Sequence, residues 1–267
     1  TYTLTVTDAN GCSVNNSAML SEPSALSITS DSETNPSCFN GDDGALSLTI
    51  SGGTTAYSYS WSDGYTTSED RTSLTAGTYA LTVTDAKGCA KSDTFTLTNP
   101  ADIEISSSMS AARCYGTATG GISLTLTGGI GSKTYQWTGP NGYSSTDEDL
   151  INLYAGGYKV VVTDANQCKD STFVTVNQPD SLKISKLFTD VLCYGDNDGT
   201  IQLQVNGGTL SYGYRWADNG SITTANRTDL SPGNYKFTVT DGRECTKSDS
   251  VTIDGPTAAL TADIDST

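Results

Sequence analysis

The chain contains no histidine and only two methionines among its 267 residues. Without histidine, neither a Ser-His-Asp nor a Cys-His catalytic arrangement can form, and the commonest side-chain metal ligand is missing. Basic residues are also scarce, because 14 Lys and Arg stand against 30 Asp and Glu, for a net charge of −16. Such a charge repels phosphate, so we expect no nucleic-acid partner and no binding to anionic membranes. No run of 18 apolar residues occurs, so we also expect no membrane insertion.

Helical periodicity of the apolar residues is absent, and an alternation takes its place. Leu46, Leu48 and Ile50 lie on one face of an extended chain, with Ser47 and Thr49 on the other. A period of two with β-branched and aromatic residues predicts half-buried antiparallel strands. The sequence therefore predicts an all-β fold.

Internal repetition is the strongest signal in the chain. Four segments (TYTLTVTDANGC, TYALTVTDAKGC, GYKVVVTDANQC and NYKFTVTDGREC) end in cysteines spaced 77, 79 and 77 residues apart. We call these the late cysteines. An early cysteine, a tryptophan and a tyrosine keep the same period. The late cysteines are Cys12, Cys89, Cys168 and Cys245; the early ones are Cys38, Cys114 and Cys193.

Proline marks the joins between the repeated units, at Pro23, Pro100, Pro179 and Pro256. Each proline closes a strand-like stretch, which suits a residue that cannot donate to a ladder. Because the joins leave almost no linker, we expect neighbouring units to touch and to stack as a rod. The chain also opens in what reads as mid-strand, so we expect a fragment of a longer protein. The predicted units are the remnant of a preceding repeat (1–23), a first repeat (24–100), a middle repeat (101–179), a last repeat (180–256) and the first strand of a following repeat (257–267).

Each complete repeat has the pattern of an immunoglobulin-like sandwich. About seven short strands, a tryptophan on the third and an L-x-[A/P]-G-x-Y stretch that fits a tyrosine corner are typical of that fold. The tryptophans have two interpretations, as core residues or as stacking platforms for sugar rings, and their recurrence at the core position favours the core. Tyr65 and Tyr143, in glycine-containing turns, are better candidates for exposed aromatic residues. The predicted core set is Trp61, Trp137, Trp216, Tyr79, Tyr158 and Tyr235.

Seven cysteines at regular spacing indicate disulfides and an oxidising compartment. A zinc site is disfavoured because no CxxC pair is present. If five strands separate the two cysteines of a repeat, these residues lie at opposite poles, roughly 25 Å apart, which is too far for a disulfide. The early cysteine of one repeat then meets the late cysteine of the next, giving Cys38–Cys168 and Cys114–Cys245, with Cys12, Cys89 and Cys193 unpaired.

Four intervening strands would instead place both cysteines of a repeat at the same pole. The pairs would then be Cys38–Cys89, Cys114–Cys168 and Cys193–Cys245. We favour pairing between repeats, because the stretch between Trp61 and the tyrosine corner is long enough for two short strands.

Two acidic turns resemble pieces of a calcium loop, since oxygen clusters on glycine-bearing turns suit Ca²⁺. No bidentate glutamate follows at the required spacing, and the matching turn of the middle repeat has no carboxylate. We therefore predict no metal site and no cofactor, and keep Asp42, Asp43, Asp196 and Asp198 as weak calcium candidates. The acidic run 147–149 could serve acid–base chemistry, but it lacks a pocket signature and fits a solvated face better. We predict that the chain is not an enzyme.

The order C-[FY]-x-G, G-G, Y-x-W, L-x-[A/P]-G-x-Y and V-T-D-x-x-x-C resembles the SprB repeat over essentially the whole chain. That family occurs in tandem in very large cell-surface proteins of Bacteroidota and is named for a gliding-motility adhesin. The resemblance implies type IX secretion, a location outside the outer membrane and a filamentous adhesin role. It carries over no catalytic residue. The family usually has a glycine directly before the late cysteine. Gln167 and Glu244 stand at this position here, so the resemblance does not establish the type of turn there.

A bacteroidotal origin also implies O-glycosylation of Ser or Thr that follows Asp and precedes an apolar residue or Thr. Four positions match this short motif, and chance matches are its alternative explanation. The candidates are Thr94, Ser171, Ser181 and Ser250.

Two functions are compatible with these features. The leading expectation is a repeat stalk of a filamentous adhesin that supports surface attachment and gliding. Its partners would be neighbouring repeats, surface polysaccharide, and outer-membrane motility or secretion machinery contacted through other regions. The alternative is a spacer or carbohydrate-binding array of a secreted polysaccharide-degrading enzyme.

Overall fold

The computed structural model describes residues 1–262, which form 21 strands and one 3₁₀ turn, Pro140–Gly142. The chain divides into two compact units. One unit contains residues 1–104 together with two loops of the middle repeat, 127–133 and 164–168. The other contains residues 105–126, residues 134–163 and the chain from Lys169 onward.

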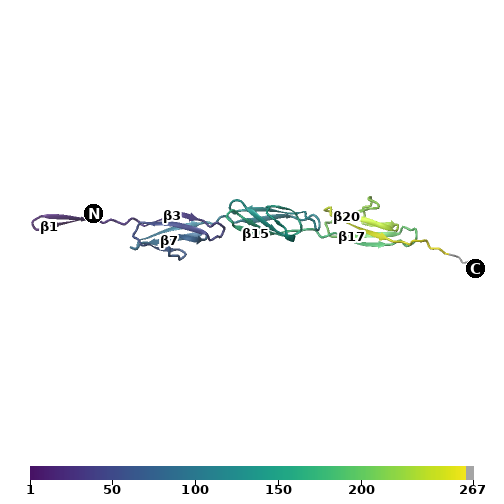
Figure 1. The fold of residues 1–267 in the computed structure, drawn as a ribbon, viewed down its shortest axis with the longest axis horizontal. Helices are drawn as coiled ribbons and strands as arrows, with labels where there is room; N and C mark the ends of the chain where they lie inside the picture. The colour runs from purple at the N-terminus through teal and green to yellow at the C-terminus, as the bar shows by residue number, and fades with distance from the viewer. Residues whose placement is uncertain (263–267) are drawn as a thin grey trace, which may run out of the picture. The chain divides into compact units, whose positions relative to one another are not determined.

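The first repeat forms two antiparallel three-stranded sheets (Figure 1). One sheet has the order β3-β4-β6 and the other β5-β7-β8. The strands are β3 (Ser27–Thr34), β4 (Gly44–Ser51), β5 (Ser58–Trp61), β6 (Arg71–Leu74), β7 (Gly77–Thr84) and β8 (Ala90–Leu97).

The other two repeats form the corresponding pair of sheets, and in the middle repeat a fourth strand extends one of them. The middle repeat has the orders β13-β10-β9 and β12-β11-β14-β15, and the last repeat has β16-β17-β19 and β18-β20-β21. About seven strands were predicted for each repeat; the first and last have six, and the middle one has seven. The strands of the middle repeat are β9 (Glu104–Ser110), β10 (Gly120–Thr127), β11 (Thr134–Thr138), β12 (Ser144–Ser145), β13 (Leu150–Leu153), β14 (Gly156–Thr163) and β15 (Lys169–Val176). Those of the last are β16 (Lys183–Thr189), β17 (Gly199–Asn206), β18 (Gly213–Trp216), β19 (Asn226–Leu230), β20 (Gly233–Thr240) and β21 (Thr246–Ile253).

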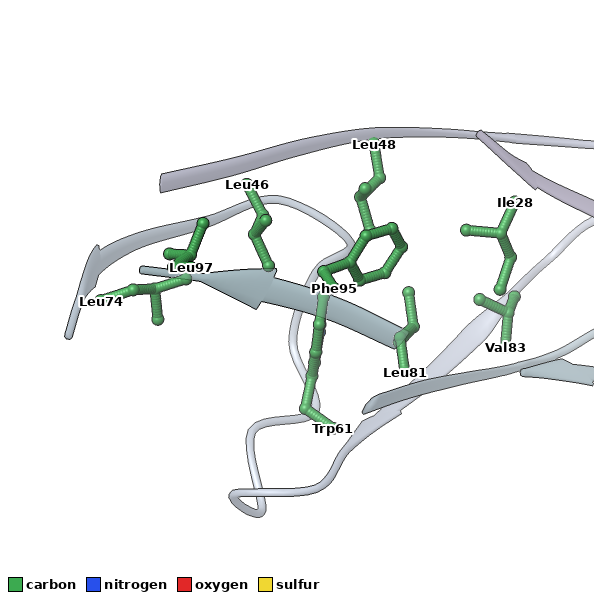
Figure 2. Close-up of a cluster of buried hydrophobic side chains, with 9 residues drawn as sticks. All are labelled: Ile28, Leu46, Leu48, Trp61, Leu74, Leu81, Val83, Phe95 and Leu97. Atoms are coloured by element: carbon green, nitrogen blue, oxygen red, sulfur yellow. The ribbon is translucent and has the colours of Figure 1, made fainter. Parts of the chain in front are cut away.

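The core of the first repeat lies between its two sheets, where alternating residues from both meet (Figure 2). Phe95 lies between Leu48 of β4 and Leu81 of β7, Ile28 lies across from Val83, and Leu46 lies beside Leu97. Each such side chain contributes about 1.5–3 kcal/mol when it is fully buried. The alternation seen in the sequence is therefore the alternation of core and solvent. Together with the tyrosine corner below, this defines immunoglobulin-like β-sandwiches.

All three tryptophan side chains are buried, with exposed fractions of 3% for Trp61 and 0% for Trp137 and Trp216. Each indole N–H donates to a backbone carbonyl seven to ten residues later, at 2.9–3.1 Å. These bonds satisfy the one polar atom of each ring. The tryptophans thus fill the core, and none offers a face on which a sugar could stack.

The three predicted corner tyrosines share one hydrogen bond. The phenols of Tyr79, Tyr158 and Tyr235 donate to the carbonyl four residues earlier, at 2.8, 2.9 and 2.8 Å. Tyr158 is buried, whereas Tyr79 and Tyr235 are half-buried at the edge of the core. This is the tyrosine corner at the passage from one sheet to the other.

Strand direction decides where the cysteines lie, and here the strand count was misleading. Only four strands, β4 to β7, separate Cys38 from Cys89. β4 and β7 end at the same pole, because the N–H of Thr54, just after β4, donates to the carboxylate of Asp85, just after β7. β6 is antiparallel to β4 and β5 is antiparallel to β7, so β5 and β6 run in the same direction.

The segment 62–70 must therefore bring the chain back between β5 and β6 without forming a strand. It replaces the missing fifth strand, and the two cysteines lie at opposite poles although four strands intervene. In the middle repeat part of the same segment is ordered as β12, which pairs with β11. There the number of intervening strands is five.

The hairpin of β1 (Tyr2–Thr7) and β2 (Ser13–Ala18) corresponds in sequence to the last two strands of a repeat. Its apolar residues Leu4 and Val6 are 66% and 55% exposed. Their counterparts Leu81 and Val83 are completely buried. Beyond the last repeat, residues 257–262 form no strand and 263–267 lie outside the described residues, so a first strand over 257–267 stays a prediction.

Candidate functional site

A buried carboxylate begins the loop before the late cysteine in each repeat. Asp85, Asp164 and Asp241 are only 7%, 3% and 4% exposed. One oxygen of Asp241 accepts the N–H groups of Arg243 and Cys245 at 2.8 and 2.9 Å, and the other accepts the N–H of Thr209 at 2.8 Å. Bonds to the corresponding positions recur in the other two repeats. The carboxylate therefore holds the cysteine loop against the Gly-Gly turn that follows the second strand.

The geometry of the Gly-Gly turn depends on its glycines. Gly207 has φ 79°, and a Cβ there would lie 2.2 Å from the carbonyl oxygen of Ser181. A residue with a side chain could not adopt this conformation without displacing the backbone. The turn thus brings the N–H of Thr209 to the carboxylate of Asp241.

These backbone donors lower the pKa of all three carboxyl groups. For Asp85, the N–H groups of Thr54 and Cys89 are the main cause of the lowered pKa. For Asp241, burial by itself raises the pKa, but the N–H groups of Thr209, Cys245 and Arg243 outweigh it and the net pKa is lowered. Asp164 follows the same pattern as Asp241. The ionised form is therefore the one that the fold stabilises.

The loops that Asp164 and Asp241 hold carry disulfides to the preceding repeat. Cys38 of the first repeat is bonded to Cys168 of the middle repeat, with the Cα atoms 5.5 Å apart. Cys114 of the middle repeat is bonded to Cys245 of the last, with a Cα separation of 5.6 Å. This is the pairing between repeats that the sequence favoured, and the alternative pairs within a repeat do not form. Cys12, Cys89 and Cys193 are free and exposed.

Polar contacts accompany each disulfide. The amide of Asn166 donates to the carbonyl of Ser37 at 3.1 Å beside Cys38–Cys168. Beside Cys114–Cys245, the guanidinium of Arg113 donates to the carbonyl of Arg243 at 2.7 Å and also contacts the carboxylate of Glu244. The departures from glycine noted at Gln167 and Glu244 do not alter the turn, because both residues adopt positive φ, 68° and 65°. The Arg113–Glu244 contact was not foreseen from the sequence.

All four weak calcium candidates are exposed, and two of them accept a backbone hydrogen bond. Asp43 and Asp198 accept the backbone N–H six residues earlier, from Ser37 and Leu192, at 2.8 and 3.1 Å. In the middle repeat the hydroxyl of Thr119 accepts the equivalent bond from Arg113 at 2.7 Å, which explains why no carboxylate is needed there. Asp42 and Asp196 are exposed. Within residues 1–262, no group of three or more Cys, Asp and Glu is placed to hold a metal ion.

The acidic run 147–149 contributes to the sandwich framework. The side chain of Asp149 accepts the N–H of Leu124 at 2.9 Å, and the carbonyl of Asp147 accepts the indole N–H of Trp137. These two bonds connect the segment between β11 and β13 to the core of the middle repeat. They explain the run without any acid–base chemistry.

The four glycosylation candidates lie at different depths. Thr94 and Ser171 are exposed, whereas Ser181 and Ser250 are half-buried. At Thr94, Ser171 and Ser250 the backbone N–H donates to the carboxylate of the preceding aspartate, which accounts for the Asp-Ser and Asp-Thr pairs structurally. Modification at these positions stays a prediction.

An arginine stacked on aromatic rings was missed at the sequence level. The guanidinium of Arg71 lies 5.2 Å from the centre of the Trp61 ring and 4.2 Å from that of Tyr65, and it is paired with Asp63 at 2.7 Å. Tyr65 is thus 39% exposed but already covered on one face.

The last repeat has a matching cluster, and the middle repeat replaces it. Arg227 lies 5.1 Å from the Trp216 ring and is paired with Asp218 at 2.8 Å. In the middle repeat Leu150, which is buried, occupies the arginine position. Tyr143 packs there edge-on against Tyr158, at 5.4 Å between ring centres, and is half-buried rather than exposed as expected.

The fold and these loops define a class of protein: tandem immunoglobulin-like sandwiches with disulfides between consecutive repeats. The family model for the SprB repeat matches three places in the chain, residues 30–66, 107–142 and 187–221. Three segments of the chain thus match the SprB repeat, as the motifs indicated. These repeats are typical of surface proteins and, with the sandwich fold, support a repeat-containing surface protein rather than an enzyme.

Solved structures with immunoglobulin domains resemble the chain at low identity. The structure described as "Crystal structure of Dpr2 Ig1-Ig2 in complex with DIP-Theta Ig1-Ig3" is 10% identical, with a TM-score of 0.30, over 85% of this chain and 98% of that one. The structure described as "Structural basis for Dscam isoform specificity" is 11% identical, with a TM-score of 0.24, over 93% and 78%. The comparison with curated proteins gives no match. No helix within residues 1–262 has the length and apolar character to cross a membrane.

Proposed function

We propose that the chain forms part of the repeat stalk of a filamentous cell-surface adhesin that supports attachment and gliding motility. In this proposal the repeats 24–100, 101–179 and 180–256 are successive domains of the stalk. The disulfides between consecutive repeats carry the proposal, because such bonds serve to keep neighbouring domains in contact. A stalk that transmits force from a cell surface to a distant contact benefits from such bonds.

Composition supports the same role. A net charge of −16 keeps neighbouring filaments apart and soluble. Repetition also allows many weak contacts along one filament to add up through their high effective concentration. We further propose export by the type IX system in a member of the Bacteroidota, with the repeats on the outer side of the outer membrane.

Labelling of live cells tests the proposal. Antibodies raised against this chain, carried on fluorescent beads, are added to cells that express the protein, and the beads are followed by microscopy. Beads that bind and travel along the cell body are expected. Beads that bind and stay fixed would overturn the motility role and leave a static stalk. Protein found only in the culture medium would overturn surface attachment and favour a spacer of a secreted polysaccharide-degrading enzyme.

A further inference from the structure

The basic residues of this acidic chain are concentrated in the last repeat. Seven of the 14 Lys and Arg lie within residues 180–256. Two of the seven, Arg227 and Lys186, are paired with carboxylates of the same repeat at 2.8 Å each. The full set is Lys183, Lys186, Arg215, Arg227, Lys236, Arg243 and Lys247.

Two of the remaining cations line a groove on the outer face of the sheet β18-β20-β21. The groove has a volume of about 660 Å³. Strand register places Arg215, Thr238 and Ser248 in one row across the three strands, and Lys236 and Ser250 in the next row. Arg215 and Lys236 are therefore diagonal neighbours on one face, a relation that separates residues by about 7–8 Å.

The charge of the groove is not neutralised from within the protein. Arg215 and Lys236 are both exposed, and neither takes part in an ion pair within residues 1–262. The one carboxylate in the lining, Asp249, is paired with Lys186 at 2.8 Å. The groove thus presents two free positive charges on a protein whose net charge is strongly negative.

Apart from Trp216 and Phe237, the rest of the lining is polar or small. Hydroxyl groups come from Ser250 and from Thr238 and Ser248, which hydrogen-bond each other at 2.8 Å, and Ala217 and Gly220 leave the end of the groove open. Trp216 and Phe237 are buried beneath the sheet, so the groove has no apolar pocket that would hold a peptide side chain. Hydroxyl groups beside two cations match the chemistry of a sugar chain that bears carboxylates.

The other repeats do not repeat this arrangement. The first repeat has Ser60 and Ala80 at the positions of Arg215 and Lys236. The middle repeat has Gln136 and Lys159, and the ammonium of Lys159 lies 5.5 Å from the centre of the Phe173 ring on the same face. Among the three repeats, only the last therefore has two neighbouring cations on this face. The first repeat provides a natural control.

We propose that this groove binds an acidic polysaccharide of the uronate type. Arg215 and Lys236 bind successive sugar carboxylates, and the hydroxyls of Thr238 and Ser248 bind the sugar hydroxyl groups. The inference deepens the proposed function, on which it rests, by naming the class of surface that the stalk contacts.

Calorimetric titration of the full chain with polygalacturonate tests the site. We expect saturable binding that weakens as salt is added, and none to neutral dextran. Replacing Arg215→Ser and Lys236→Ala together copies the first repeat and is expected to weaken binding by about tenfold or more, since one charge-assisted hydrogen bond is worth that much. The control Lys87→Ala with Lys91→Ala removes the same charge from the first repeat and is expected to bind as the wild type does.

Gain of function sharpens the test. Ser60→Arg with Ala80→Lys is expected to add a second site in the first repeat, seen as a higher stoichiometry. Equal binding by the groove variant and the wild type, or no binding at all, would overturn the proposal. Stronger binding of poly-glutamate than of polygalacturonate would show an acidic peptide site instead. None of these results affects the bead experiment, so failure of the site and failure of the adhesin role are distinguishable.

Discussion

At the scale of single residues, the buried aspartates Asp85, Asp164 and Asp241 carry the most structural information. Each accepts three backbone N–H groups, so one carboxylate joins two loops that are about 30 residues apart in sequence, as in the bond from Thr209 to Asp241. Two of the three bonds are local to the V-T-D-x-x-x-C motif, since their donors lie two and four residues after the aspartate. The motif did not predict the third bond, because the Gly-Gly turn that supplies it is remote along the chain.

Replacing Asp241 by asparagine should destabilise the last repeat. The amide would keep the bonds from Arg243 and Cys245, but its NH₂ group would face the N–H of Thr209. Two opposed donors leave a buried group without a partner, which costs about 1–3 kcal/mol. Urea unfolding measures the loss. Asp196→Asn is the control, since that side chain is exposed and makes no hydrogen bond within residues 1–262. A variant at Asp241 as stable as this control would contradict the prediction.

The same carboxylates predict how stability depends on pH. Their pKa values are lowered in the folded protein, so they lie below the unfolded value of about 3.9. Each therefore stabilises the fold above about pH 4, and this contribution is lost as the pH falls through the folded pKa. We expect the midpoint of thermal unfolding to drop steeply below about pH 4. Asp241→Asn should flatten the drop for the last repeat, and an unchanged slope would refute the assignment.

At the scale of elements, the first and last repeats use an arginine where the middle repeat uses a leucine. Arg71 and Arg227 cover the indole rings of Trp61 and Trp216 and are paired with aspartates, and only about a tenth of each side chain is exposed. Leu150 has the equivalent register position in the middle repeat and is buried. The three repeats thus reach one strand arrangement with two different fillings of the same space.

Arg227→Leu and Arg227→Ala should differ in their effects. The alanine loses the packing of the side chain, the cation–π contact and the pair with Asp218, and we expect a loss of about 1–2 kcal/mol. The leucine restores packing as Leu150 does and should lose less than half as much. Thermal unfolding of both variants decides, and equal losses would show that charge rather than packing dominates at this position.

At the scale of the whole molecule, the pairing of cysteines is the central feature. Cys38–Cys168 and Cys114–Cys245 each span about 130 residues and join consecutive repeats. The early cysteine of the last repeat, Cys193, and the late cysteine of the first, Cys89, are left exposed and unpaired. These two free cysteines are thus a direct consequence of pairing from one repeat to the next.

Peptide mapping under non-reducing conditions should recover two linked peptide pairs, Cys38 with Cys168 and Cys114 with Cys245. Alkylation of the unreduced protein should modify three thiols, those of Cys12, Cys89 and Cys193, because these side chains are exposed. Reduction should expose four more. A peptide linking Cys38 to Cys89 would contradict the structure and would show that the cysteines pair within one repeat.

The sequence alone determined the repeat, its period, the β class and the core positions. These follow from local properties: alternation places Leu46 and Leu48 on one face, and the recurring tryptophan and tyrosine lie where a sandwich has its core and its corner. Each of these signals is carried by residues a few positions apart. Similar side chains in each repeat then give similar sheets.

Only the tertiary structure decided which cysteines meet and where free charge gathers. The four strands between Cys38 and Cys89 would by themselves predict pairing within the first repeat. That prediction is wrong because the segment 62–70 reverses the chain without forming a strand. The pole at which Cys89 lies depends on that reversal, which no alternation pattern records. Arg215 and Lys236 likewise come together only through the register of β18 and β20, since residues 21 positions apart become neighbours only when the strands pair.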